Sequence, residues 1–145
     1  RFMVTKSEMN GIQGWFLKRL GCFSINQLSP SLAVLRYAVD LIVKKRQLVV
    51  FPEGKINKYG KKIVLKEGLF RLARLAKKQA TLITIIPIGI AYSEVTPTFR
   101  SDFSLCFGEP LIISDNISFS INEFNEILHN KMTAAENEAL KILGR

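Results

Sequence analysis

The chain has 145 residues, of which 48% are hydrophobic and 23% are charged. This is the composition of a folded domain, and it excludes a disordered tail or a bundle of membrane helices. The formal net charge of +9 indicates an anionic partner, but nucleic acid, an acidic membrane surface and a phosphorylated metabolite all fit that charge.

Hydrophobic periodicity predicts strands and helices in alternation through the first half of the chain. Ser29 and Pro30 are expected to be the N-cap and first residue of a helix that extends to about Lys45. On its outer side Arg36 and Asp40 are spaced to form an ion pair. The predicted elements are a strand at 1–5, a short helix at 12–20, a strand at 21–25, the helix from 29 and a strand at 47–51.

The second half begins with a basic loop and a helix from about Lys66 to Lys78 that is apolar on one side and basic on the other. Residues 82–91 read as a buried central strand, with a bulge or an edge at Pro87 because proline cannot donate a ladder hydrogen bond. That apolar stretch is shorter than the ~20 residues that cross a bilayer, so we expect no transmembrane helix. Further strands are predicted at 103–107 and 111–113, and a final helix opens on an S-x-x-E capping box at Ser120 and Glu123.

This order of elements predicts an α/β fold, a three-layer sandwich in which helices flank a mixed, mostly parallel sheet. We expect one domain over residues 1–145. Residues 1–6 resemble the middle of a strand, so the beginning of the chain is expected to be a truncation. Cys22 and Cys106 have neither disulfide-framework nor metal-ligand spacing, which predicts buried thiols in a reducing compartment.

The densest polar feature follows the strand at 47–51, in the run from Val49 to Lys55. Pro52 stiffens the exit from the strand, Glu53 offers a carboxylate acceptor, and Gly54 allows a ligand to approach the backbone. The lysines that follow add positive charge. These residues together could hold a polar head group, although a turn beside a solvated lysine run would give the same pattern.

Other binding motifs fit poorly. A P-loop is excluded because five residues separate Gly54 from Gly60, and Lys62 stands where a magnesium-binding Ser or Thr is required. No zinc, Rossmann or nucleophile-elbow motif occurs, so we expect no metal and no bound cofactor. The lone histidine, His129, falls inside the last helix without a nucleophile beside it, which favours a surface or helix-stabilising role.

The residues at the end of the strand predicted at 47–51 resemble a motif of a known family. Phe51-Pro52-Glu53-Gly54 is similar to the FPEG block of the glycerolipid acyltransferases of the lysophosphatidic acid acyltransferase type. The resemblance extends over nearly the whole chain in order and spacing. The other similar segments are Val4–Glu8, Gly21–Ile25, Leu65–Ala73, Ile86–Ile90 and Phe107–Pro110.

The resemblance implies transfer of a fatty acyl group from acyl-CoA or acyl carrier protein to a glycerol-phosphate acceptor. It implies a catalytic His-x4-Asp motif upstream of residue 1, so this chain is expected to contain no catalytic residue and to be inactive by itself. It also places Pro87 on the acyl-donor side. The implied substrate-binding residues are Lys6, Phe51, Pro52, Glu53, Gly54, Lys55 and Lys66.

Two positions depart from the family pattern. Lys55-Ile56-Asn57 stands where many members have Thr-Arg-Ser, and Gln27 stands where an arginine often follows the second strand. The departures bear on how the acceptor's phosphate is held.

The resemblance and the charge together predict a peripheral protein at the cytoplasmic face of a membrane, with a lysophospholipid or glycerol phosphate and an anionic membrane surface as partners. Two other functions fit the sequence. A catalytically inactive lipid-binding relative would lack the upstream motif. A nucleic-acid-binding module would need aromatic side chains interleaved with the basic ones, and between residues 55 and 78 only Tyr59 and Phe70 are aromatic, so no nucleic acid is expected.

Overall fold

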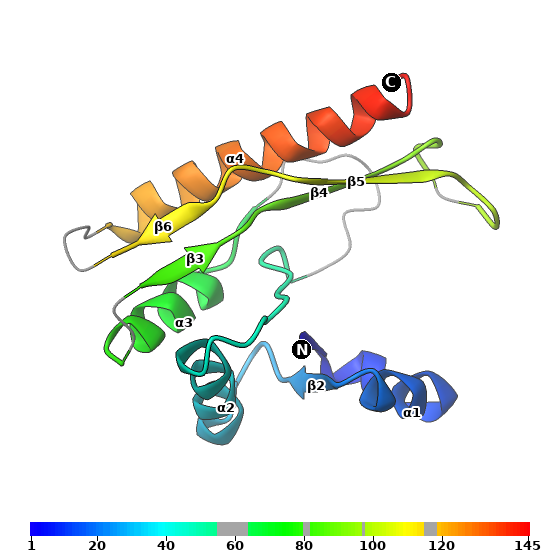
Figure 1. Ribbon diagram of the computed structural model, residues 1–145. Coiled ribbons are helices and arrows are strands. Elements are labelled where there is room, and N and C mark those ends of the chain that lie inside the picture. The colour runs from blue at the N-terminus through cyan, green and yellow to red at the C-terminus, as the bar shows by residue number, and fades with distance from the viewer. Residues whose placement is uncertain (55–63, 80–81, 97, 115–118) are drawn as a thin grey trace. The chain divides into compact units, whose positions relative to one another are not determined.

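The computed structural model describes residues 1–54, 64–79, 82–96, 98–114 and 119–145. The chain divides into two compact units. Unit 1 comprises residues 1–55 and 66–83, and unit 2 comprises residues 56–65 and 84–145. The α/β class predicted from the sequence is confirmed, because each unit combines helices with short strands (Figure 1). The expectation of one domain stays a prediction.

Unit 1 is built around a parallel strand pair. Its elements are β1 (Phe2–Thr5), the 3₁₀ helix η1 (Lys6–Met9), α1 (Gly11–Arg19), β2 (Cys22–Ile25), α2 (Leu32–Val43) and α3 (Gly68–Lys77). β1 and β2 run parallel, with Phe2 opposite Cys22 and Thr5 opposite Ile25. On the other side of β1, Val49 forms a parallel bridge to Phe2. The strand predicted at 47–51 is therefore present only as this bridge in the described structure.

Helices α2 and α3 bury small and branched apolar residues in unit 1. Ala38, Val39 and Leu41 of α2 are buried, as are Leu72, Ala73 and Ala76 of α3. The ring of Phe23 in β2 meets the ring of Tyr37 in α2 edge to face, with the ring centroids 5.0 Å apart, and this contact joins the helix to the strand. Arg71 and Arg74 of α3 are exposed, as its sequence predicts.

Two predictions for α2 are wrong. The helix begins at Leu32, and its N-cap is Ser31 instead of Ser29, since the Ser31 hydroxyl accepts a hydrogen bond from the Val34 amide at 3.3 Å. Asp40 pairs with Lys44 at 2.9 Å instead of with Arg36. The acid-before-base order at i,i+4 is the more favourable one on a helix, and Asp40 with Lys44 has that order.

Unit 2 packs a long helix on an antiparallel strand pair. Its strands are β3 (Ile83–Ile85), which begins at the unit boundary, β4 (Ile88–Tyr92), β5 (Phe103–Phe107) and β6 (Leu111–Ile113). β4 pairs with β5, and β3 pairs with β6. The helix α4 (Ile121–Ile142) lies along the β4–β5 pair (Figure 1).

The predicted strand over 82–91 is split at Ile86 and Pro87 into β3 and β4. The Pro87 carbonyl accepts a hydrogen bond from the Gly108 amide at 2.8 Å, so at the break the chain is bonded to the residue that directly follows β5. Proline has no N–H to continue the ladder, which is the reason for the break. The expected bulge or edge at Pro87 is thus an interruption between two strands.

The last helix agrees with its sequence. The Ser120 amide donates to a Glu123 carboxylate oxygen at 2.8 Å, and the Glu123 amide donates to the Ser120 hydroxyl at 3.3 Å, which completes the predicted capping box. Phe124, Leu128, Ala135 and Ala139 are buried along one stripe. No helix within the described residues is long and apolar enough to span a membrane. Cys22 and Cys106 are free thiols and are half-buried.

Candidate functional site

Three segments of unit 1 each follow a parallel strand, and all three begin at the same edge of its small sheet. β1 lies between β2 and the Val49 bridge, and both pairings are parallel. Lys6 follows β1, Gln27 comes two residues after β2, and the turn at 51–54 follows Val49. The carboxyl edge of parallel strands is where ligands bind in α/β sheets. The topology therefore brings Lys6, Gln27 and the turn to one edge.

The Phe51–Gly54 segment forms a tight turn. The Gly54 amide donates to the Phe51 carbonyl at 3.1 Å, which closes a four-residue β-turn with Pro52 at its second position. Proline suits that position because its fixed φ matches the turn. Gly54 has φ +67°, a left-handed conformation that other residues adopt with strain. The turn thus depends on both its proline and its glycine.

Lys66 attaches to this turn through its backbone and through its side chain. Its amide donates to the Pro52 carbonyl at 2.9 Å. Its ammonium donates to the side-chain oxygen of Gln27 at 3.4 Å. A Cβ on Gly54 would lie 3.0 Å from the Lys66 Cδ and Cε, so the lysine stem passes directly over the glycine. Residues from three separate segments therefore meet at the turn.

The predicted substrate-binding residues fall as follows. Lys6, Phe51 and Lys66 are exposed in unit 1, and Pro52, Glu53 and Gly54 are half-buried in the turn beside them. Lys55 lies outside the described residues, as do Lys58, Lys61 and Lys62 of the basic loop. Pro87 belongs to unit 2. Gln27 was not among the predicted site residues, although its departure from the family's arginine marked the position.

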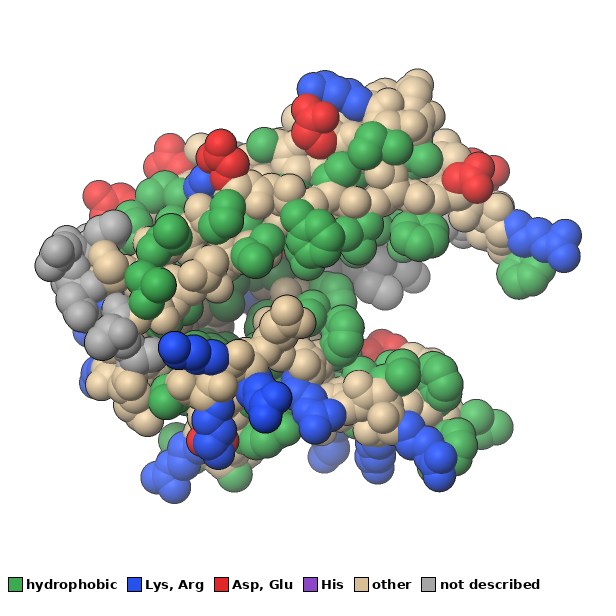
Figure 2. Space-filling model, viewed as in Figure 1, with side chains coloured by type: hydrophobic (Ala, Val, Ile, Leu, Met, Phe, Trp, Pro, Cys, Tyr) green, Lys and Arg blue, Asp and Glu red, His purple; other side chains and the backbone are tan. Residues whose placement is uncertain are grey.

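The positive charge of the protein lies in unit 1. This unit carries 14 Lys and Arg against 4 Asp and Glu, whereas unit 2 carries 7 against 8. Figure 2 shows basic side chains gathered over unit 1, and most of the acidic side chains in this view over unit 2. An anionic ligand would therefore be attracted to the unit that contains the turn.

A general base is not evident at this edge within the described residues, where no group of His, Cys, Asp and Glu could hold a metal ion either. His129 lies in α4 of unit 2, and its Nδ1 is buried without a hydrogen-bond partner among the described residues. The ring is half-buried, so the surface or helix-stabilising role expected from the sequence stays a prediction.

Comparison with known proteins shows the family of the chain. The model of the Acyltransferase family matches residues 1–91, which include the parallel strands, the turn and Lys66. The chain belongs to the Acyltransferase family. It is 28% identical over 116 residues to the 1-acyl-sn-glycerol-3-phosphate acyltransferase of Streptococcus pneumoniae. The match covers 79% of this chain but only 41% of that enzyme. No solved structure matches the chain significantly.

Proposed function

We propose that the complete protein transfers a fatty acyl group to the free hydroxyl of a glycerol-phosphate acceptor in phospholipid biosynthesis, with lysophosphatidic acid as the acceptor. The observation that carries the proposal is the Phe51–Gly54 turn with Lys66 at the edge of the parallel strands, inside the segment that matches the Acyltransferase family. The name of the similar S. pneumoniae enzyme supports an acceptor of the glycerol-3-phosphate class.

The reaction needs little from this chain beyond binding and positioning. The acceptor hydroxyl attacks the carbonyl of an acyl thioester, a C–O bond forms, and the C–S bond breaks to release the thiol of coenzyme A or of acyl carrier protein. A histidine of the upstream His-x4-Asp motif would take the hydroxyl proton and pass it to the leaving sulfur. No further cofactor is required. Glu53 and Gly54 would contact the glycerol phosphate, with Lys6 near its phosphate.

The proposal also covers the fold of the catalytic domain and the place where the protein works. We infer that the catalytic domain as a whole is a three-layer sandwich with a mostly parallel sheet, and that Pro87 shapes its acyl-donor side. The acceptor is a membrane lipid, so the protein would work as a peripheral protein at the cytoplasmic face of a membrane. The excess of basic residues in unit 1 supports an anionic surface as its docking partner.

The test is an acyl-transfer assay on the complete protein as it is encoded. Lysophosphatidic acid and radiolabelled acyl-CoA, or acyl carrier protein loaded with the same chain, are the substrates, and labelled phosphatidic acid is the expected product. Replacement of the histidine of the upstream motif should abolish the product. Saturable lysophosphatidic acid binding without any transfer from either donor would refute the proposal and favour a lipid-binding protein.

A further inference from the structure

Gln27 and Lys66 make a contact that no local sequence pattern predicts. The two residues are 39 positions apart, yet the Lys66 ammonium lies 3.4 Å from the Gln27 side-chain oxygen. The same oxygen would be 3.1 Å from a Cβ on Gly54, so the pair lies across the backbone of the turn. All three residues belong to unit 1.

The partner of Lys66 leaves its charge intact. A glutamine oxygen is neutral, so it orients the ammonium without cancelling it. By contrast, Lys44 and Arg71 lie in ion pairs with carboxylates at 2.9 Å and 2.7 Å. An ammonium has three N–H donors, and Gln27 takes one of them. The 3.4 Å separation is also long for a hydrogen bond, so an arriving anion displaces little.

The backbone keeps this ammonium at the turn. The hydrogen bond from the Lys66 amide to the Pro52 carbonyl, at 2.9 Å, fixes the start of the side chain. The close passage over Gly54 directs the stem toward Gln27. The amide and the ammonium of Lys66 are thus both hydrogen-bonded. Such a lysine loses less conformational freedom when it binds a ligand than a solvated surface lysine does.

We propose that Lys66, positioned by Gln27 across Gly54, supplies the charge that binds the phosphate of the acyl acceptor and so sets the preference for a phosphorylated acceptor. Lys66 contacts the ligand, and Gln27 is a positioning residue that acts through it. The proposal rests on the proposed function for the identity of the acceptor. The rival explanation is that the pair only holds the turn in place.

Direct binding separates the two explanations. We would titrate the complete protein with glycerol 3-phosphate, and with glycerol as the uncharged comparison, by isothermal titration calorimetry. Lys66→Gln should weaken glycerol 3-phosphate binding about tenfold or more, the size of one charge-assisted hydrogen bond. Lys66→Arg should retain most of the affinity. Arg74→Gln, which removes an exposed charge from α3 of the same unit, is the matched control and should change the affinity little.

Substitutions at Gln27 test the positioning role. Gln27→Leu should weaken binding by a smaller factor than Lys66→Gln, because the ammonium remains but is no longer oriented. Gln27→Glu should weaken it as much as Lys66→Gln, because a carboxylate would cancel the charge. Since the two side-chain ends meet, the double variant Gln27→Arg with Lys66→Gln places a cation at the same point from the other segment and should recover binding.

Kinetics give a second readout. With lysophosphatidic acid as acceptor, Lys66→Gln should raise KM about tenfold and leave kcat nearly unchanged, while turnover of monoacylglycerol, which lacks the phosphate, should not change. Failure of the wild-type protein to bind glycerol 3-phosphate would overturn the inference, as would equal losses for Lys66→Gln and Arg74→Gln. Binding with the expected pattern but no acyl transfer would leave the inference standing and remove the proposed function alone.

Discussion

Gly89 of β4 lies directly against the backbone of Ala135 in α4. A Cβ built on Gly89 would overlap the carbonyl group of Ala135 and the amide of Glu136. Because these atoms belong to the helix backbone, a side chain cannot be accommodated by a rotamer change. The absence of a side chain at residue 89 is therefore what allows α4 to lie close on the β4–β5 pair.

Gly89→Ala is accordingly expected to destabilise the protein by about 1–3 kcal/mol, the usual cost of overpacking. The measurement is urea unfolding followed by circular dichroism. Gly68→Ala is the matched control, since nothing lies within 4 Å of a Cβ at Gly68. Alanine favours the helix over glycine, so this variant should be neutral or slightly more stable. Equal stability of the two variants would contradict the close packing of α4.

The capping box of α4 leads to a prediction on stability and pH. Hydrogen bonds from the backbone amide and the side chain of Ser120 lower the pKa of Glu123. A carboxylate whose pKa is lower in the folded chain stabilises it at pH values above the ordinary glutamate pKa. That stabilisation is lost as the pH falls through the lowered pKa.

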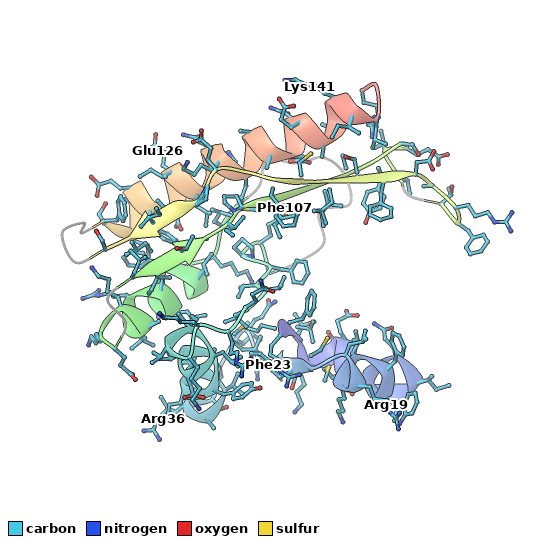
Figure 3. All side chains as sticks on the ribbon, in the orientation of Figure 1. Arg19, Phe23, Arg36, Phe107, Glu126 and Lys141 are labelled. Carbon is cyan, nitrogen blue, oxygen red and sulfur yellow. The ribbon has the colours of Figure 1, made fainter. Side chains whose placement is uncertain are left out.

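Ser120→Ala should cost about 1 kcal/mol, because the Glu123 amide loses the hydroxyl that accepts its hydrogen bond. Glu123→Gln should destabilise the protein near neutral pH and have less effect in acid, where Glu123 of the unaltered chain is protonated. Glu126→Gln, on the exposed part of the same helix (Figure 3), should leave the free energy of unfolding nearly unchanged at both pH values. A Glu123→Gln penalty that stayed constant into acid would show that the carboxylate charge contributes nothing to the cap.

Glu53→Ala tests the role of the turn in the complete enzyme. We expect a lower turnover on the glycerol-phosphate acceptor with little change in melting temperature, because this carboxylate lies in a half-buried turn at the strand edge and outside the core. Glu109→Ala removes an exposed carboxylate from unit 2 and is the control. A large loss of melting temperature with normal kinetics would instead mean that Glu53 only stabilises the turn.

Membrane binding should depend on salt. α3 buries Leu72 and Ala76 and exposes Arg71 and Arg74, and Lys78 follows at its end. Each basic residue near an anionic surface contributes about 1 kcal/mol to the free energy of membrane binding. The screening length of such charges shortens from about 10 Å at 0.1 M salt to about 3 Å at 1 M. The protein should therefore co-sediment with anionic vesicles at low salt and release at high salt.

Replacing Arg71, Arg74 and Lys78 together by glutamine should weaken this sedimentation without unfolding the protein. Salt-resistant binding to neutral vesicles would contradict the electrostatic account. It would indicate insertion of apolar side chains, for which Trp15 and Phe16 of α1 are the candidates, being 58% and 56% exposed.

The sequence by itself determined the elements whose signals are local. The capping box, the final helix and the strands β5 and β6 were all predicted at the residues where they form, because helix caps and apolar alternation act over a few neighbouring positions. The Phe51–Gly54 turn was also predicted from the sequence, since proline fixes φ and glycine adopts the left-handed conformation that a turn requires. The candidate site was located by that turn.

Only the tertiary structure decided matters that require a choice between equivalent partners or contacts between distant segments. Ser29 and Ser31 could each cap α2, and Arg36 and Lys44 are equally spaced from Asp40, so spacing alone did not choose between them. The meeting of Gln27 with Lys66 depends on the parallel pairing that brings strand ends to one edge. Pairing of that kind joins residues far apart in the chain, so no local pattern of either segment encodes it.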